Sequence, residues 1–406
     1  MAREVVITGL GAVSALGRGV DALRAGLASG RSAIATLALL PYEGRCRLAA
    51  EVREPVEPGE ELELATRRRL SRPDCFALAA AREALGDARL DAGARRGAAL
   101  VVGATTGGMR ETEAAYRRWL AGASTRLPLS RVLGTPLACA GAAVSQAFGV
   151  YGAQETISTA CSSSALAIGR AADLVRHGAT PVAIALGTDA LCRLTQGGFD
   201  ALQALDPAGC RPFDRDRRGL TLGEGAAALV IEDAAHARAR GARVRARLLG
   251  WGSATDAHHP TAPHPEGAGA RAALRRALAA AGVPPEAVDY VNAHGTGTPQ
   301  NDATEIMVLR AVLGRRATRV PVSSTKAQIG HCLGAAGALE AAVTVLALEE
   351  GLLPPTARLR EPDPLCADMD LVPAPGRRAP LATAITSSYG FGGHNVTLVL
   401  ARADAA

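Results

Sequence analysis

The sequence predicts an α/β protein with layers of helices around largely buried strands. Short runs of Gly, Ala and branched aliphatic residues, typical of buried strands, alternate with longer Ala- and Leu-rich helical stretches along all 406 residues. No low-complexity linker divides the chain. A weak internal repeat is the second observation, because similar segments recur in the same order in two parts of the chain. We therefore expect two halves, residues 1–242 and 243–406.

The repeat pairs three segments of each half. Residues 4–14 (EVVITGLGAVS) resemble residues 244–254 (VRARLLGWGSA), since each reads as a strand that ends in glycines. Residues 100–108 (LVVGATTGG) resemble residues 288–298 (VDYVNAHGTGT), where a strand opens into a loop of small residues. Residues 158–161 and the helix after them resemble residues 324–326 and the helix after His331. Corresponding elements would lie around a pseudo-two-fold axis.

Composition is that of an ordinary globular protein, with 48% hydrophobic and 21% charged residues. The apolar N-terminal run is broken by Gly9 and Gly11 before it reaches signal-peptide length, and no segment holds eighteen uninterrupted apolar residues. We expect a cytoplasmic protein with no membrane span. The net charge is +6, but aromatic residues make up only 3% and no basic recognition stripe exists, which argues against a nucleic-acid partner.

Cysteine and lysine usage is informative. Eight cysteines without C-x-x-C spacing indicate reduced thiols. Lys326 is the sole lysine, and every other Lys/Arg position is arginine. Because arginine does not replace lysine where a compact ammonium is needed, Lys326 is a candidate functional residue.

Cys161 is the candidate nucleophile. It stands where a strand of small residues gives way to a helical stretch, residues 162–177, that Gly178 closes. Free N–H groups and the helix dipole favour a thiolate at this position. A small buried core cysteine would fit the same residues.

His294 follows a predicted strand and lies among glycines in residues 293–298 (AHGTGT). The loop leads into a helix for which Asp302 and Glu305 have the spacing of a capping box. Thr296 and Thr298 offer hydroxyls to an amide-bearing ligand. A structural histidine is the alternative.

His331 lies five residues after Lys326 and directly before a long apolar helix, residues 332–350, that Gly351 ends. A histidine at a helix N-terminus is kept neutral by the positive potential there, and a neutral imidazole donates one hydrogen bond to a developing oxyanion. A capping histidine beside a solvated lysine is the alternative.

Other motifs give weaker signals. Phe391 stands between glycines in residues 387–395 (SSYGFGGHN), which indicates a mobile or strained loop or a plain turn. His258, His259 and His264 are interrupted by prolines, so we expect no metal site. Residues 9–14 (GLGAVS) lack the third glycine of a dinucleotide fingerprint, and no G-x-S-x-G elbow occurs.

Four motifs in order carry a resemblance to a known family. TACSSS (residues 159–164), HGTGT (294–298), K-x-x-x-x-H (326–331) and GFGG (390–393) resemble the elongating, type II β-ketoacyl-acyl carrier protein synthases, along nearly the whole chain. The Cys-His-His set differs from the Cys-His-Asn of chain-initiating synthases and the Cys-His-Cys of thiolases. Chain-length-factor relatives lack the nucleophile. The resemblance implies the thiolase fold, a duplicated five-layered α-β-α-β-α unit.

The resemblance also implies a mechanism without metal or other cofactor, in which the substrates are carried on the phosphopantetheine of an acyl carrier protein. Cys161 would accept the acyl group, with its amide and that of Phe391 as the oxyanion hole. His294 and His331 would stabilise the enolate formed when carbon dioxide leaves, and Lys326 would orient His331 and the neighbouring network. Further roles implied are phosphopantetheine binding for Thr296 and Thr298, gating for Phe391, the acyl pocket for Thr106, structural support for Glu340 and Asn395, and carrier docking for Arg68 and Arg72.

The pathway stays open at this point. Fatty acid chain elongation is the first expectation, and a ketosynthase of a type II polyketide or polyene pathway is the second, motivated by the polar Thr106 and by His394, where many bacterial enzymes have threonine. A non-catalytic chain-length partner subunit is the third. We expect a homodimer, or a heterodimer with a paralogous subunit.

Overall fold

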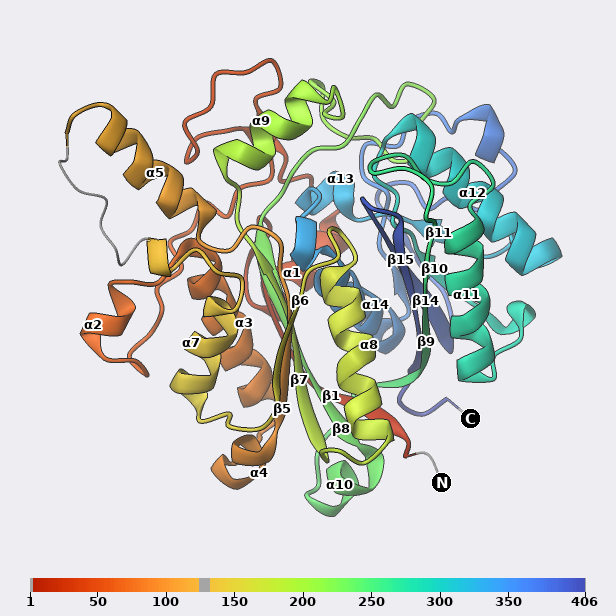
Figure 1. Ribbon diagram of the computed structural model, residues 1–406. Helices are drawn as coiled ribbons and strands as arrows, with labels where there is room; N and C mark the ends of the chain where they lie inside the picture. Colours follow the sequence, from red (N-terminus) through yellow and green to blue (C-terminus); the bar gives the residue numbers. More distant parts are fainter. Residues whose placement is uncertain (1–2, 124–131, 406) are drawn as a thin grey trace.

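The computed structural model describes residues 3–123 and 132–405. Within them, one long sheet runs in the order β11-β10-β14-β15-β9-β1-β8-β7-β5-β6 (Figure 1), with the short β2 paired to β1. The amino-terminal part supplies β1 (Val5–Ser14), β5 (Ala99–Gly103), β6 (Gln154–Ile157), β7 (Val182–Asp189) and β8 (Gly225–Asp233). The carboxy-terminal part supplies β9 (Ala246–Thr255), β10 (Tyr290–Asn292), β11 (Val322–Ser323), β14 (Thr383–Gly390) and β15 (His394–Arg402).

The two parts of the sheet share one topology. In each part the first strand pairs antiparallel with the last, the last pairs antiparallel with the fourth, and the fourth and third flank the second in parallel. The parts join where β1 pairs antiparallel with β9, at Val6 with Arg247 and Ile7 with Ala246. The same strand order in both parts supports the internal repeat read from the sequence. A boundary at residues 242 and 243 stays a prediction.

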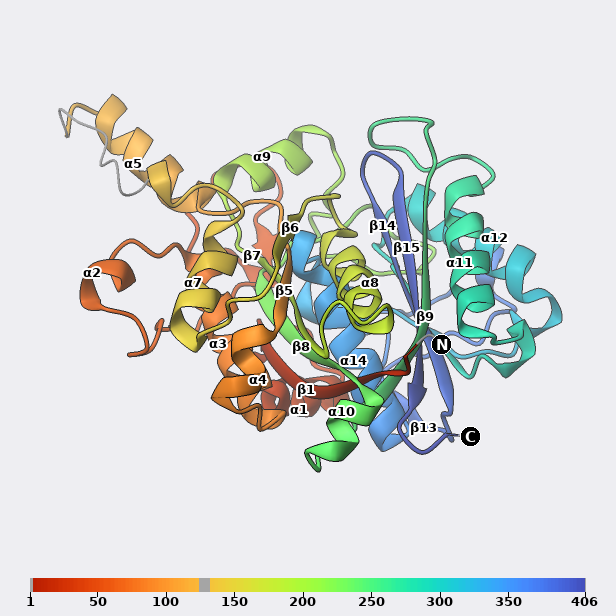
Figure 2. The same cartoon turned by 60° about the horizontal axis from the view of Figure 1, so that its bottom comes forward.

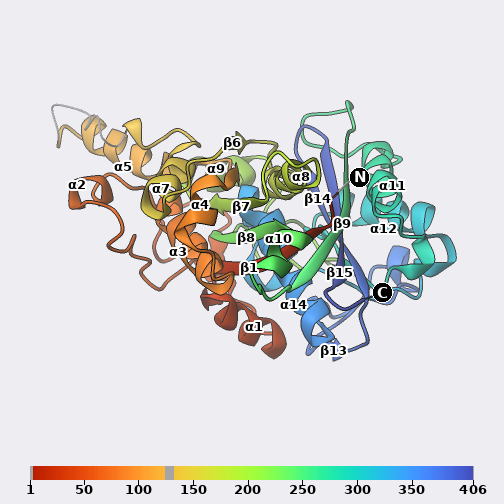
Figure 3. The same cartoon turned by 90° about the horizontal axis from the view of Figure 1, so that it is seen from below.

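Five layers stack through the molecule, as Figures 1 and 3 show. Helices α3 (Arg72–Asp87) and α7 (Cys139–Phe148) cover the outer face of the amino-terminal strands, and α11 (Ala268–Ala281) and α12 (Pro299–Leu313) cover the carboxy-terminal strands. Helices α8 (Ser163–Arg176) and α14 (Ala336–Glu350) lie between the two sets of strands and contact both. The α-β-α-β-α fold predicted from the sequence is therefore confirmed.

The central layer is built from small apolar residues. Helix α14 is apolar on all sides and buried from Ala336 to Leu348, as expected for a helix between two sheets. A Cβ added at Gly337 would lie 2.6 Å from the Ala165 nitrogen, so α14 and α8 approach too closely there for any larger residue. Glu340 is the only charged residue in the buried part of α14.

Shorter elements complete the fold. Helix α5 projects from one end of the molecule (Figure 2), and α9 lies above the central layer in Figure 1. Among the described residues, every helix is too short or too polar to cross a lipid bilayer. All eight cysteines have free thiols. The remaining elements are α1 (Val20–Ser29), α2 (Leu64–Arg67), α4 (Ala92–Gly97), α5 (Met109–Leu120), α9 (Arg193–Ala201), α10 (Ala234–Ala239), α13 (Lys326–Ile329), β2 (Gly17–Arg18), β3 (Ala35–Thr36), β4 (Leu48–Ala49), β12 (Leu352–Leu353) and β13 (Arg377–Arg378).

Candidate active site

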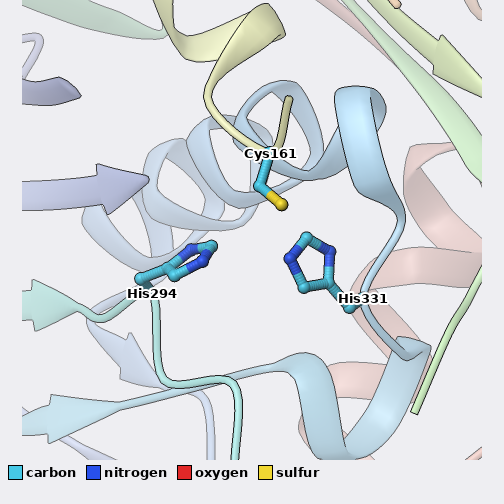
Figure 4. A group of neighbouring side chains, drawn as sticks. All are labelled: Cys161, His294 and His331. Carbon is cyan, nitrogen blue, oxygen red and sulfur yellow. The ribbon is translucent and has the colours of Figure 1, made fainter. Parts of the chain in front are cut away.

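Three side chains from distant parts of the chain meet at the start of α8. Cys161 precedes α8, His294 follows β10, and His331 lies between α13 and the 3-10 turn Leu333–Ala335. One ligand atom from each, sulfur or ring nitrogen, lies within 4.8 Å of the others, and all three residues are buried. Figure 4 shows the side chains pointing into a common space. The imidazole rings stand edge to face, with centroids 5.3 Å apart.

Cys161 occupies the predicted place at a helix start. Ala160 adopts the left-handed conformation (φ 52°), which turns the chain so that Cys161 and the N-cap Ser162 lead into α8. Burial raises the pKa of the Cys161 thiol to about 11, against the opposing effects of the Lys326 charge and the Phe391 backbone N–H. The backbone N–H of Cys161 at the helix start lowers the pKa, in the expected direction, but burial outweighs it. At neutral pH the resting nucleophile is a thiol.

His331 has a defined tautomer. The backbone N–H of Leu333 donates to its Nδ1 (3.1 Å), so the neutral ring carries its proton on Nε2. Burial lowers the pKa of His331 well below its usual value, and the Lys326 charge lowers it further. The ring is neutral as expected, but the cause is not the helix end: the long helix begins at Ala336, four residues later than predicted from position 332.

His294 is held by the single lysine. Lys326, which is 1% exposed, places Nζ 3.3 Å from His294 Nδ1 and donates to the His294 carbonyl oxygen and to Glu340. An ammonium donating to Nδ1 leaves the His294 proton on Nε2, as in His331. Burial, Lys326 and His331 all lower the pKa of His294. Lys326 was expected to orient His331 and the neighbouring network. Its side-chain hydrogen bonds go to His294 and Glu340 of that network, so the expectation of a direct contact with His331 is corrected.

Glu340 supports this lysine from α14. The Lys326–Glu340 ion pair is buried on both sides, with 1% and 3% of the side chains exposed. Burial raises the pKa of Glu340 to about 7, and the lysine charge opposes that rise. Neither residue lines the cavity that Cys161 faces, so both act from behind the histidines.

Two further carboxylates hold the His294 loop, and sequence reasoning misread them. Thr298 caps α12, and Asp302 instead accepts the N–H groups of Phe213 (2.8 Å) and Gly297 (3.1 Å). Glu305 accepts the N–H groups of His294 (2.8 Å) and of the next glycine (2.7 Å). The predicted capping box is therefore wrong. The sequence did show two carboxylates about one helical turn after a glycine loop. It did not show that the N–H groups that they accept lie outside the helix.

Phe391 sits on a turn packed against the nucleophile; we call residues 390–393 the gate loop. A Cβ added at Gly390 would lie 2.6 Å from the Thr159 carbonyl oxygen, so the loop touches the chain beside Cys161 directly. The Phe391 ring stacks on Phe199 of α9, with centroids 5.4 Å apart. Phe199 was missed, since one phenylalanine on a surface helix carries no local signal.

Asn395 ties the gate loop to the strand beside it. Its side-chain nitrogen donates to the Gly393 carbonyl (2.9 Å) and to Asp256 (3.0 Å). The Asp256 backbone N–H donates to the same Gly393 carbonyl (2.9 Å). This agrees with the structural role expected for Asn395.

A cavity of about 420 Å³ leads to the cluster. Cys161 and both histidines lie among its lining residues, together with Thr296 and Thr298, whose hydroxyls are 2.9 Å apart. Thr106 does not line this cavity, and its hydroxyl bonds with the buried carboxylate of Asp189 (2.7 Å). The polarity of Thr106 is thus satisfied within the protein.

The two arginines expected to dock a carrier protein differ. Arg68 is exposed at the end of α2. Arg72 grips the fully buried carboxylate of Glu224 with two nitrogens, at 2.6 and 3.0 Å, and its guanidinium lies 4.8 Å from the Phe76 ring centroid. Its charge is therefore already paired, which gives Arg72 a structural role. Docking of a carrier protein by Arg68 or Arg72 stays a prediction.

Among the described residues, the Cys161, His294 and His331 atoms form the one His/Cys/Asp/Glu cluster with metal-like spacing. His258 and His264 have ring centroids 5.2 Å apart but do not belong to such a group.

Comparison with known proteins identifies the family to which this arrangement of residues belongs. Residues 2–237 match the family model described as "Beta-ketoacyl synthase, N-terminal domain", and residues 245–360 match "Beta-ketoacyl synthase, C-terminal domain". The chain belongs to the β-ketoacyl synthase family. It is a condensing acyltransferase with a Cys-His-His cluster.

The relatives extend over the whole chain. The synthase is 38% identical over 410 residues to 3-oxoacyl-[acyl-carrier-protein] synthase 2 of Coxiella burnetii, covering 98% of this chain and 99% of the relative. It is 39% identical over 404 residues to nodulation protein E of Rhizobium meliloti, with 98% and 99% covered. The solved structure titled "The ishigamide ketosynthase/chain length factor" superposes with a TM-score of 0.93 at 35% identity, covering 99% of this chain and 100% of that one.

Proposed function

We propose that this synthase joins an acyl group held on Cys161 to a malonyl unit on an acyl carrier protein by decarboxylative Claisen condensation. The observation that carries the proposal is the pair of neutral imidazoles beside the thiol. Leu333 and Lys326 occupy the Nδ1 atoms of His331 and His294, which leaves two Nε2–H donors for one oxygen near the sulfur.

Acyl transfer is the first half-reaction. The Cys161 sulfur attacks the thioester carbonyl of an acyl-phosphopantetheine, and the Cys161 proton ends on the departing thiol. The backbone N–H groups of Cys161 and Phe391 stabilise the tetrahedral oxyanion, and the Phe391 N–H already lowers the pKa of the thiol in the resting enzyme.

Condensation is the second half-reaction. When the malonyl C–CO₂ bond breaks, its electron pair forms an enolate whose oxygen accepts the Nε2–H bonds of His294 and His331. The enolate carbon then attacks the Cys161 thioester, a C–C bond forms, and the C–S bond breaks. The sulfur leaves as a thiolate and takes a proton from water to regenerate the resting thiol. Neutral histidines suit this step, because a buried imidazolium would hand its proton to the carbanion and end the reaction before the new bond forms.

Carrier recognition and assembly belong to the same proposal. Thr296 and Thr298 hold the amide-bearing arm, Phe391 gates the acyl pocket, and the exposed Arg68 meets the acidic carrier protein. The chain works as a homodimer or as a heterodimer with a paralogous subunit. The similar solved structure is named as a ketosynthase with a chain length factor, which supports the heterodimer. The mass of the assembly in solution distinguishes the two arrangements.

Fatty acid elongation is the first candidate pathway. The likeness to the Coxiella burnetii synthase supports it. The likeness to a ketosynthase paired with a chain length factor favours a type II polyketide or polyene ketosynthase instead. The assembled cluster of Cys161, His294 and His331 argues against a non-catalytic partner subunit.

Product analysis tests the reaction and separates the pathways. The purified chain is mixed with saturated or unsaturated acyl-carrier proteins and malonyl-carrier protein, and products are identified by mass spectrometry. A β-ketoacyl product two carbons longer is expected from the wild type and from the control Cys75→Ala, which alters a half-buried thiol on α3. Cys161→Ala should give none. Turnover of saturated donors alone indicates fatty acid elongation, and a requirement for unsaturated donors or a second subunit indicates the other pathway.

A further inference from the structure

Arg218 stands out from the arginines around it. Arg211, Arg215 and Arg217 each have a carboxylate partner, respectively Asp206, Glu361 and Asp363. In the part of the chain that the structure describes, the Arg218 side chain has no hydrogen-bond or ion-pair partner.

The free arginine lines the cavity that leads to the nucleophile. Cys161, His294 and His331 are 6%, 1% and 1% exposed, whereas Arg218, Gln203 and Gln300 are exposed lining residues. Burial thus orders the cavity from a closed inner end at the sulfur to an open mouth at Arg218.

The mouth of the cavity, at Arg218, differs in charge from the rest of the cavity lining. Among the described residues that line the cavity, Arg218 is the only Lys or Arg. The one lining carboxylate, Asp256, already accepts the Asn395 side chain (3.0 Å) and the backbone N–H groups of Gly269 (3.0 Å) and His264 (3.1 Å). The unpaired guanidinium therefore has no competing carboxylate among the lining residues.

We propose that Arg218 binds the phosphate of the phosphopantetheine arm. The inference rests on the proposed function, which places the thioester end of that arm at Cys161. The phosphate is the anionic group at the other end, so it reaches the mouth when the thioester reaches the sulfur. A guanidinium matches phosphate oxygens with two parallel N–H donors, and the amides of Gln203 and Gln300 are further donors in the lining of the same cavity. Arg218 is thus a positioning residue that sets how far the arm enters.

Protection of Cys161 from iodoacetamide tests this without requiring turnover. The half-protecting concentrations of 4′-phosphopantetheine and of pantetheine, which lacks the phosphate, are compared by intact mass. We expect phosphopantetheine to protect at about tenfold lower concentration, as for a charge-assisted contact at a solvated mouth. R218A should abolish this difference, R218K should retain part of it, and 0.5 M NaCl should shrink it in the wild type.

The matched control is R215A, which removes an exposed arginine of the same segment that is paired with Glu361 outside the cavity lining. It should keep the wild-type difference. Equal protection by both compounds in the wild type, or a phosphate preference that survives R218A, would overturn the inference. A defect of R218A with carrier-bound donors but not with free phosphopantetheine would also overturn it, because Arg218 would then contact the carrier protein surface. Failure of the proposed function appears separately, as the absence of acylation or product with any donor.

Discussion

Replacement of Lys326 by arginine keeps the charge and should still remove most of the condensing activity. The Lys326 ammonium serves three acceptors at one point: His294 Nδ1, the His294 carbonyl oxygen and a Glu340 oxygen. An ammonium directs three donors from a single atom, whereas a guanidinium spreads its donors over a rigid plane. Arginine is also longer, and the site is 1% exposed.

The magnitude follows from these contacts. Overpacking a buried site costs about 1–3 kcal/mol of folding free energy, so K326R should remain folded. Loss of the donor to Nδ1 frees His294 to move its proton from Nε2, which removes one of the two enolate donors. Loss of one such donor lowers a rate by roughly 10²- to 10³-fold.

The assay separates the two half-reactions. Acylation of Cys161 is followed by rapid-quench intact mass, and condensation is followed in a single turnover after malonyl-carrier protein is added. Condensation should fall by roughly 10²-fold or more in K326R, and acylation should fall much less, because Lys326 acts through His294. Urea unfolding reports stability in parallel.

A second pair of variants controls for burial of charge. Lys326→Met leaves Glu340 without its partner and should lower stability by about 3–5 kcal/mol. Adding Glu340→Gln should recover part of that stability but none of the condensing rate. Full activity of K326R, or recovery of condensation in the double variant, would refute the reasoning.

Three further outcomes are expected. Because the pKa of Cys161 is raised to about 11, the thiolate fraction and the iodoacetamide alkylation rate should climb about tenfold per pH unit between pH 7 and 10; a plateau near pH 8 would contradict this. Glu305→Gln should lower stability by about 1–3 kcal/mol and slow condensation, measured by urea unfolding and single turnover, because one buried backbone N–H at the His294 loop loses its acceptor; unchanged values would count against a positioning role. Arg72→Ala should lower stability by about 3 kcal/mol, because the buried Glu224 carboxylate loses its bidentate partner and keeps only Arg110, at 4.0 Å, as a charged neighbour, whereas Arg68→Ala should leave unfolding unchanged and raise KM for acyl-carrier protein; the reverse pattern would assign docking to Arg72.

Much of the site was predictable because its signals are local. Cys161 stands at a helix start, His294 follows a strand, and His331 precedes a helix, so the residues next to each define where it projects. The repeated segments that end in glycines likewise indicated two similar halves, and both parts of the sheet have the same strand order. Lys326, the sole lysine, was predicted to occupy a position that needs a compact ammonium. Its burial agrees with that prediction.

The errors involve contacts between residues far apart in the chain. Arg72 is 152 residues from Glu224, and the run of arginines at residues 67–69 suggested an exposed basic patch that includes it. Asp302 and Glu305 have the local spacing of a cap, yet their partners include Phe213, 89 residues from Asp302. The pKa of Cys161 depends mainly on burial by the whole fold, so the helix start alone could not predict the direction of the net shift.

The most direct test of the account is the mass of the enzyme itself. The wild type and Cys161→Ala are incubated with acyl-carrier protein, and intact mass and peptide mapping are recorded before and after malonyl-carrier protein is added. The account predicts one acyl group on the peptide that contains Cys161, its disappearance on addition of the malonyl donor, and no adduct on the variant. An acyl adduct on Cys161→Ala, or a wild-type acyl group that malonyl-carrier protein never discharges, would contradict it.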